Sequence, residues 1–167
     1  FSTEHKGRLW AAGVAANPSR LYYSGKDNPE LWTPSASAIG APGYIDISPG
    51  DGDEIRGIAS FKDELWVFKG PNKGSIHRIT GSSPSDFSRI LFIRGLACVG
   101  HSTIVPFKDD ILFMTPSGSI RSLKATAAFG DYNDAAITFP INQWLIDNLS
   151  KSALKTAWAV NDPTTSH

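Results

Sequence analysis

The sequence contains a single cysteine, Cys98, so it cannot form an internal disulfide bond and does not demand an oxidising compartment. Neither charge is in excess, because 16 Lys and Arg balance 16 Asp and Glu. We therefore expect no binding of nucleic acid or of an anionic membrane through net positive charge. The longest apolar runs, such as Ile90–Ile93 and Ile111–Met114, are far too short to cross a bilayer as a helix. This predicts a chain without membrane anchoring that is made in the cytoplasm.

Turn-forming residues, by contrast, are abundant. The 167 residues include 15 glycines and 11 prolines, and 41% of the chain is hydrophobic. This composition is typical of a folded, turn-rich chain and excludes a disordered one. The only methionine is Met114, so no initiator methionine is present, and we expect the chain to be a processed product or part of a longer polypeptide.

Short apolar or alternating runs, bounded by Gly, Pro, Asn, Asp and Ser, predict that most of the chain is β-structure. Each run is short enough to be one strand of a sheet. The candidate strands are Arg8–Gly13, Arg20–Ser24, Tyr44–Ile47, Ile55–Phe61, Glu64–Lys69, Ser75–Thr80, Ser88–Arg94, Ser102–Phe107, Asp110–Thr115, Ser119–Lys124 and Ala136–Phe139.

An internal repeat organises these strands. The segment Phe61–Phe68 recurs 46 residues later as Phe107–Met114. Each copy runs through a glycine-containing turn into a second similar strand, Gly74–Ile79 in one and Gly118–Leu123 in the other. A fainter third copy begins at Lys6–Trp10. The pattern predicts three related β-hairpins.

Repeats of this length with several antiparallel strands are typical of β-propeller blades. We therefore predict an all-β fold, a partial propeller of about three four-stranded antiparallel blades over residues 5–48, 55–94 and 102–139. Blades pack on both faces, which explains why Leu65–Phe68 is a continuous apolar run. A β-sandwich with two similar hairpins is the alternative that the spacing leaves open.

One segment has helical periodicity. Ile141, Trp144, Leu145 and Leu149 share one helical face and follow Pro140, which favours a helix start. We predict a short helix over 141–149, within an insertion at 140–150. The next segment, Thr156–Asn161, predicts the first strand of a further blade spanning 155–167. Since 167 residues hold only about three and a half blades, we expect a larger propeller.

Two clusters could carry metal or nucleophile chemistry. The acidic stretch Asp46–Glu54 is a poor match to a calcium loop, because position twelve is Gly57 instead of a bidentate glutamate. It is better interpreted as a turn leading into the strand at Ile55. Cys98 and His101 are close in sequence, but neither a catalytic pair nor a four-ligand zinc site follows from that. We expect Cys98 to be buried as a small apolar residue.

The remaining candidates also have structural interpretations. The repeated acids Asp63, Glu64, Asp109 and Asp110 lie in the turn that opens each hairpin, and Asp is a turn former. Aromatic rings could form a sugar-stacking surface, but we expect core packing instead and leave Trp32 as the one candidate for an exposed ring. The five tryptophans are Trp10, Trp32, Trp66, Trp144 and Trp158. We predict no catalytic, cofactor-binding or metal-binding residue and no enzymatic activity.

The order of these motifs, from Arg8 to about Asn161, resembles the β-propeller structural proteins of tailed bacteriophages. The segments that carry the resemblance, besides the two Phe-Lys-Asp hairpins, are Pro18–Ser24, Asn28–Trp32, Ser48–Ile55, Cys98–Val105, Asp110–Phe113 and Gly118–Arg121. The resemblance implies a tail nozzle, hub or head-to-tail adaptor in the virion. Such a protein would form a ring with copies of itself, contact connector or other tail proteins, and let genomic DNA pass as cargo. It implies no catalytic residues.

Two other interpretations remain open at this point. One is a propeller enzyme or lectin that acts on glycans at the host cell surface, with its acids outside this sequence. The other is a β-domain of a secreted bacterial protein. Ring-shaped oligomers would favour the structural protein, whereas a monomer that cleaves a glycan would favour the enzyme.

Overall fold

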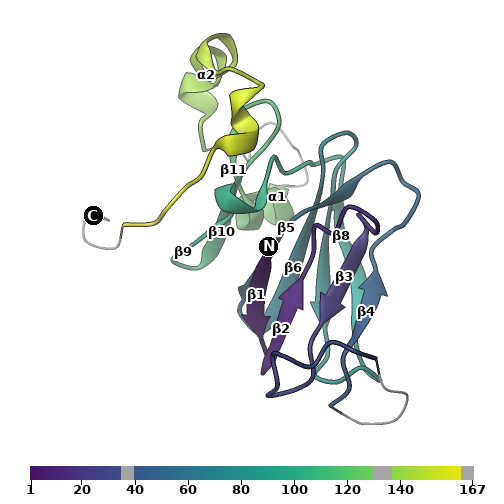
Figure 1. Cartoon of the computed structure of the whole chain (residues 1–167). Coiled ribbons are helices and arrows are strands. Elements are labelled where there is room, and N and C mark those ends of the chain that lie inside the picture. Colours follow the sequence, from purple (N-terminus) through teal and green to yellow (C-terminus); the bar gives the residue numbers. More distant parts are fainter. Residues whose placement is uncertain (35–39, 130–136, 163–167) are drawn as a thin grey trace. The chain divides into compact units, whose positions relative to one another are not determined.

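The computed structural model describes residues 1–34, 40–129 and 137–162. They belong to two compact units, Phe1–Ala97 and Cys98–His167. The strands form three antiparallel sheets of four, four and three strands, which confirms the prediction of a mostly β chain (Figure 1). Among the described residues, no helix combines the length and apolar character that crossing a membrane requires.

Sheet 1 is a four-stranded meander in the first unit. Its strands, in spatial as well as chain order, are β1 (Ser2–His5), β2 (Arg8–Ala11), β3 (Arg20–Tyr23) and β4 (Gly43–Asp46). The sequence predicted the last three. It did not predict β1, because Ser2–His5 is polar and lacks apolar alternation. This segment becomes a strand by pairing with β2, with Ser2 opposite Ala11 and His5 opposite Arg8.

Sheet 2, also in the first unit, repeats the meander with longer strands. They are β5 (Glu54–Phe61), β6 (Glu64–Gly70), β7 (Ser75–Thr80) and β8 (Ser88–Arg94). All four agree with the predicted strands to within one residue at each end. The agreement arises because each strand is a short apolar or alternating run and turn-forming residues bound it, a pattern that indicates strand ends well.

The turns that open the repeated hairpins have similar backbone conformations. In the β1–β2 turn, φ is 50° at Lys6 and 70° at Gly7. In the β5–β6 turn it is 49° at Lys62 and 59° at Asp63, and Lys108 of the third hairpin has φ 51°. Positive φ at the centre of a two-residue loop matches the right-handed twist of the flanking strands. The hairpins predicted from the repeat follow these turns and are confirmed as antiparallel pairs, with Leu65 opposite Ile79, Leu112 opposite Ser122 and, in the fainter copy, Trp10 opposite Tyr23.

Sheets 1 and 2 pack face to face around one apolar core, and Figure 1 shows sheet 1 in front of sheet 2. The core residues are Trp10, Ala12, Leu21, Tyr23 and Ile47 from sheet 1 and its loops, and Ile55, Ile58, Leu65, Val67 and Ile79 from sheet 2. The first strands of the two sheets lie side by side, since His5 Nδ1 is 2.9 Å from Ser60 Oγ. The chain therefore leaves sheet 1 at its last strand, β4, and enters sheet 2 at β5, which lies next to β1, the first strand of sheet 1.

Sheet 2 is apolar on both faces. Leu65 and Val67 point into the core shared with sheet 1. Trp66 and Phe68 alternate with them along β6 and are also buried, at 7% and 0% exposure. Ile76, opposite Phe68 on β7, is fully buried too. This arrangement accounts for the continuous apolar run in the sequence.

Sheet 3 lies in the second unit and has three strands, β9 (Val105–Phe107), β10 (Asp110–Met114) and β11 (Ile120–Ser122). Strand β9 starts later than predicted because His101–Thr103 forms a 3-10 helix, η1. Of the predicted fourth strand, residue 136 lies outside the described residues. Its remainder forms a turn and the 3-10 helix η2 (Phe139–Ile141), although Ile137 N–H donates to Ile120 O at 3.0 Å.

A helix that was not predicted follows β11, namely α1 (Leu123–Phe129). Its start is capped, because Ser122 Oγ accepts from Ala125 N–H at 2.9 Å and Asp110 Oδ1 accepts from Lys124 N–H at 2.9 Å. A serine before an alanine-rich segment is an N-cap signal that could have identified this helix. The predicted later helix is confirmed as α2 (Asn142–Asn148).

The predicted strand at Thr156–Asn161 is wrong. Its first residue ends the 3-10 helix η3 (Ala153–Thr156), and no strand is formed in residues 157–162. Ala159 N–H does donate to Ser102 O at 2.9 Å. However, Ser102 belongs to the 3-10 helix η1, and helical backbone cannot extend a ladder of strand hydrogen bonds.

Candidate functional site

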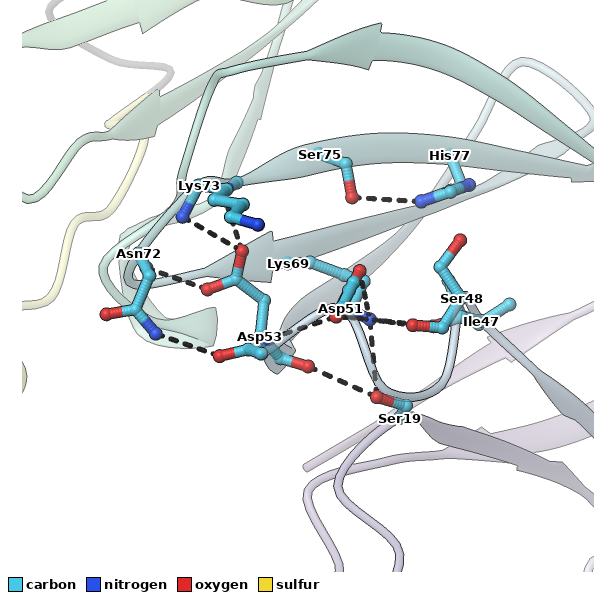
Figure 2. A network of polar contacts seen from close by, with 12 residues as sticks. Ser19, Ile47, Ser48, Asp51, Asp53, Lys69, Asn72, Lys73, Ser75 and His77 are labelled. Carbon is cyan, nitrogen blue, oxygen red and sulfur yellow. Dashed lines mark hydrogen bonds and ion pairs between the residues drawn. The ribbon is translucent and has the colours of Figure 1, made fainter.

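The loop from β4 to β5, which carries most of the acidic stretch, is anchored by Lys69 of β6 (Figure 2). The Lys69 side chain is fully buried. Its ammonium donates to the carbonyl oxygens of Ile47 at 2.7 Å and Ser48 at 3.0 Å. Both carboxylate oxygens of Asp51 lie 2.8 Å from Nζ. Lys69 thus attaches the crossover, the loop that connects β4 of sheet 1 to β5 of sheet 2, to the inner strand β6.

This arrangement saturates the ammonium. Ser19 Oγ, at 3.2 Å, adds a further oxygen around the three protons of Nζ. Burial raises the pKa of Asp51, but hydrogen bonds from Lys69 and from Asp53 N–H outweigh it and leave the pKa below its usual value. A lysine with all its protons engaged does not serve as a base or nucleophile. Its position indicates a structural role.

Asp53 has a similar role at the other side of the loop. Its carboxylate accepts from the backbone N–H groups of Asn72 (2.7 Å), Lys73 (3.0 Å) and Gly74 (2.8 Å), all in the β6–β7 turn. Gly74 has φ +70°, and a Cβ there would overlap the backbone of Leu96 and Ala97. The acidic stretch therefore forms structural turns, as predicted. In the described part of the chain, no group of three or more His, Cys, Asp or Glu could hold a metal ion.

His77 of β7 lies near the same network. It is 2% exposed, its Nε2 lies 3.0 Å from Ser75 Oγ, and its Nδ1 has no hydrogen-bond partner in the described structure. Burial, together with the positive charges of Arg89 and Lys69, lowers the pKa of His77 to about 4. His77 is therefore neutral at pH 7. Sequence reasoning singled out neither His77 nor Lys69, because each is an isolated residue in an apolar strand.

The low pKa of His77 predicts a stability loss in mild acid. The unfolded chain takes up the histidine proton near pH 6.5 and the folded chain only near pH 4, so stability falls as pH drops from 6.5 to 4. We expect His77 to account for about 2–3 kcal/mol of this loss. Chemical denaturation at pH 7 and at pH 4 measures this loss. Between these pH values, the free energy of unfolding of His77→Gln should fall by about 2–3 kcal/mol less than that of wild type. An NMR titration of His77 near 6.5 would contradict the prediction.

Cys98 is fully buried, as expected, and its Sγ lies 3.5 Å from Gly100 O and 3.9 Å from Thr103 Oγ1. His101 begins the 3-10 helix η1 and is partly exposed. The contacts of Cys98 are those of a buried thiol that packs as a small residue. The geometry favours a packing role for this cysteine.

Of the repeated acids, Glu64 and Asp110 are the first residues of β6 and β10, directly after the turns that open the hairpins. Glu64 accepts from Arg78 at 2.8 Å across sheet 2. Asp110 accepts from Ile111 N–H at 2.7 Å and from Ser122 Oγ, in addition to Lys124 N–H at the start of α1. These contacts stabilise turns and a helix start.

The tryptophans divide into buried and exposed rings. Trp10 and Trp66, at equivalent positions of the repeat, are buried as predicted. Trp32 is 37% exposed, but Trp144 and Trp158 are more exposed, at 63% and 79%. The expectation that only Trp32 is exposed is therefore wrong. Helical periodicity placed Trp144 on an apolar face, but a face is buried only where another element covers it.

An apolar groove of about 450 Å³ lies in the second unit. One face of sheet 3 and residues 158–162 contribute most of its lining. The residues lining it are Thr103, Val105, Phe107, Leu112, Met114, Ile120, Trp158, Ala159, Val160, Asn161 and Asp162. The opposite face of β10 carries Ile111 and Phe113, which are fully buried. Sheet 3 thus has one buried apolar face and one that is half-exposed.

Comparison with models of known protein families found no match, and a search of curated proteins found no similar sequence.

Proposed function

We propose that this chain is part of a β-propeller that serves as a non-enzymatic structural component of a bacteriophage tail. The observation that carries the propeller is the connection between sheets 1 and 2. The chain leaves the last strand of one meander and enters the next beside the first strand, β1. Successive blades of a propeller follow each other in this way around a central axis.

The polar network at the crossover supports the same proposal. A crossover that sets the position of one sheet on the next needs a defined conformation, and Lys69 and Asp53 fix it from both sides. The sheet faces support it as well, because a blade packs against a neighbour on each side. Sheet 2 has apolar side chains buried on both faces, and sheet 3 leaves one apolar face half-exposed.

The resemblance of the motifs to phage tail propellers supports a place in the virion. We propose a ring of copies that contacts connector or tail proteins and surrounds the channel through which the genome passes. The balanced charge of 16 basic and 16 acidic residues suits a channel wall, because a strongly basic wall would bind the DNA and impede its passage.

A glycan-binding propeller at the host cell surface is the second candidate. The observation that favours it is the exposure of Trp144 and Trp158, since exposed rings can stack on the apolar faces of sugars.

The two candidates differ in what the purified protein does. For the structural role we expect a ring-shaped oligomer in light scattering and electron microscopy, and no binding on a glycan array. A monomer that binds or cleaves a glycan would overturn the structural role in favour of the second candidate.

A further inference from the structure

Two apolar sheet faces of this chain, one on sheet 3 and one on sheet 1, are partly exposed to solvent. The Met114 face of sheet 3 comprises Val105, Phe107, Leu112, Met114 and Ile120, all half-buried. The Leu9 face of sheet 1 lies opposite its core side and comprises Leu9, Ala11, Tyr22 and Tyr44. Tyr44 is 48% exposed, and the other three are half-buried.

The internal repeat relates these two faces to one that is already packed. Aligning the hairpin turns places Leu9 at the position of Leu65 in sheet 2, and Leu112 at the position of Trp10 in sheet 1. In the first unit, the Trp10 side of sheet 1 packs on the Leu65 and Val67 side of sheet 2. The Met114 face is thus the equivalent of one half of this contact, and the Leu9 face is the equivalent of the other half.

We propose that the Met114 face of one copy of this chain packs on the Leu9 face of the next copy. This contact between two copies would repeat the sheet-on-sheet packing that joins sheets 1 and 2 within the first unit. The proposal rests on the proposed ring and specifies which surfaces form it. Because the two faces differ, the interface is head-to-tail, which gives rings when the rotation closes.

Each charged group described on the Leu9 face already has a polar partner within the chain. Glu4, opposite Leu9, adds an exposed carboxylate, whose Oε1 accepts from Gly7 N–H at 2.9 Å. Arg20 and Asp46 form an ion pair, joined by bonds of 2.8 Å and 3.1 Å. The Arg20 guanidinium also stacks on Tyr44, 3.7 Å from the ring centroid. The pair is neutral as a whole and already satisfied, so an apolar sheet can cover it. On the other copy, the exposed Trp158 and Val160 beside the Met114 face add apolar area.

The test places one charge on each face of the 167-residue chain. Met114→Lys alters one face and Tyr22→Lys alters the other. Each variant alone should associate at least tenfold more weakly than wild type, because association would bury an unpaired ammonium. Mixed in equal amounts, the two should form a heterodimer through their one intact pair of faces. Sedimentation velocity measures both results.

Ile90→Lys is the matched control, because Ile90 is an exposed apolar strand residue outside both faces. It should assemble like wild type. Circular dichroism checks that every variant folds, and Met114→Gln replaces Met114→Lys if the latter does not. The proposal is overturned if wild type assembles and either face variant assembles equally well, or if the mixture gives no heterodimer; the proposed ring would then still stand. A wild type that stays monomeric overturns the ring and, with it, this contact.

Discussion

Replacing Trp10 with alanine is expected to lower the free energy of unfolding by about 3–5 kcal/mol. Trp10 is fully buried at the centre of the core between sheets 1 and 2. Its ring centroid lies 5.0 Å from that of Tyr23 and 5.1 Å from that of Phe87, and its Nε1 donates to His5 O at 3.2 Å. The substitution removes these contacts and leaves a cavity. Urea denaturation followed by circular dichroism measures the loss.

Trp158→Ala provides the control for this experiment. Trp158 is 79% exposed, so the same change of residue type should alter the free energy of unfolding by only about 0.5 kcal/mol or less. Equal destabilisation by the two substitutions would show that Trp10 does not join the two sheets as described.

The second large effect concerns Lys69. We expect Lys69→Met to lower the free energy of unfolding by about 2–4 kcal/mol. Methionine fills much of the space, but the carbonyls of Ile47 and Ser48 lose their donor and Asp51 loses its ion pair. Asp51 is 31% exposed, so water offsets part of the cost on its side. The crossover from β4 to β5 should then open more easily, with faster amide exchange in that loop.

Lys73→Met is the matched control, since it removes the same charge from an exposed side chain whose backbone N–H, not its ammonium, bonds Asp53. We expect little change there. A double-mutant cycle with Asp51→Asn separates the ion pair from the carbonyl contacts: the double variant should lose less stability than the two single losses added together. Full additivity would contradict the pairing of Lys69 with Asp51.

Much of the fold follows from local patterns. The four strands of sheet 2 were predicted within one residue, because apolar alternation and Gly-containing turns agree along the whole segment. The repeat of Phe61–Phe68 and Phe107–Met114 predicted the hairpins β6–β7 and β10–β11, which the structure forms, each after a turn with a left-handed lysine. The short helix after Pro140 was also predicted, from the helical spacing of its apolar residues and from the proline before it.

Other features depend on partners far away in the sequence. Ser2–His5 is a strand only because β2 pairs with it, and Thr156–Asn161 is not a strand because its neighbour Ser102 lies in a 3-10 helix. Trp144 has helical spacing but is 63% exposed. A sequence pattern states which face of an element is apolar, whereas the neighbouring elements decide whether that face is covered.

The sequence by itself determined that this chain is built from repeated, turn-linked β-hairpins, because strand alternation and turn conformation are properties of neighbouring residues. Only the tertiary structure decided that the single buried lysine of β6 holds the acidic loop, which brings Asp51 and Lys69 together across 18 residues of chain. It also decided which apolar faces are packed and which are open. The reason is physical: burial and pairing of charges depend on contacts between distant segments, and these exist only once the sheets have come together.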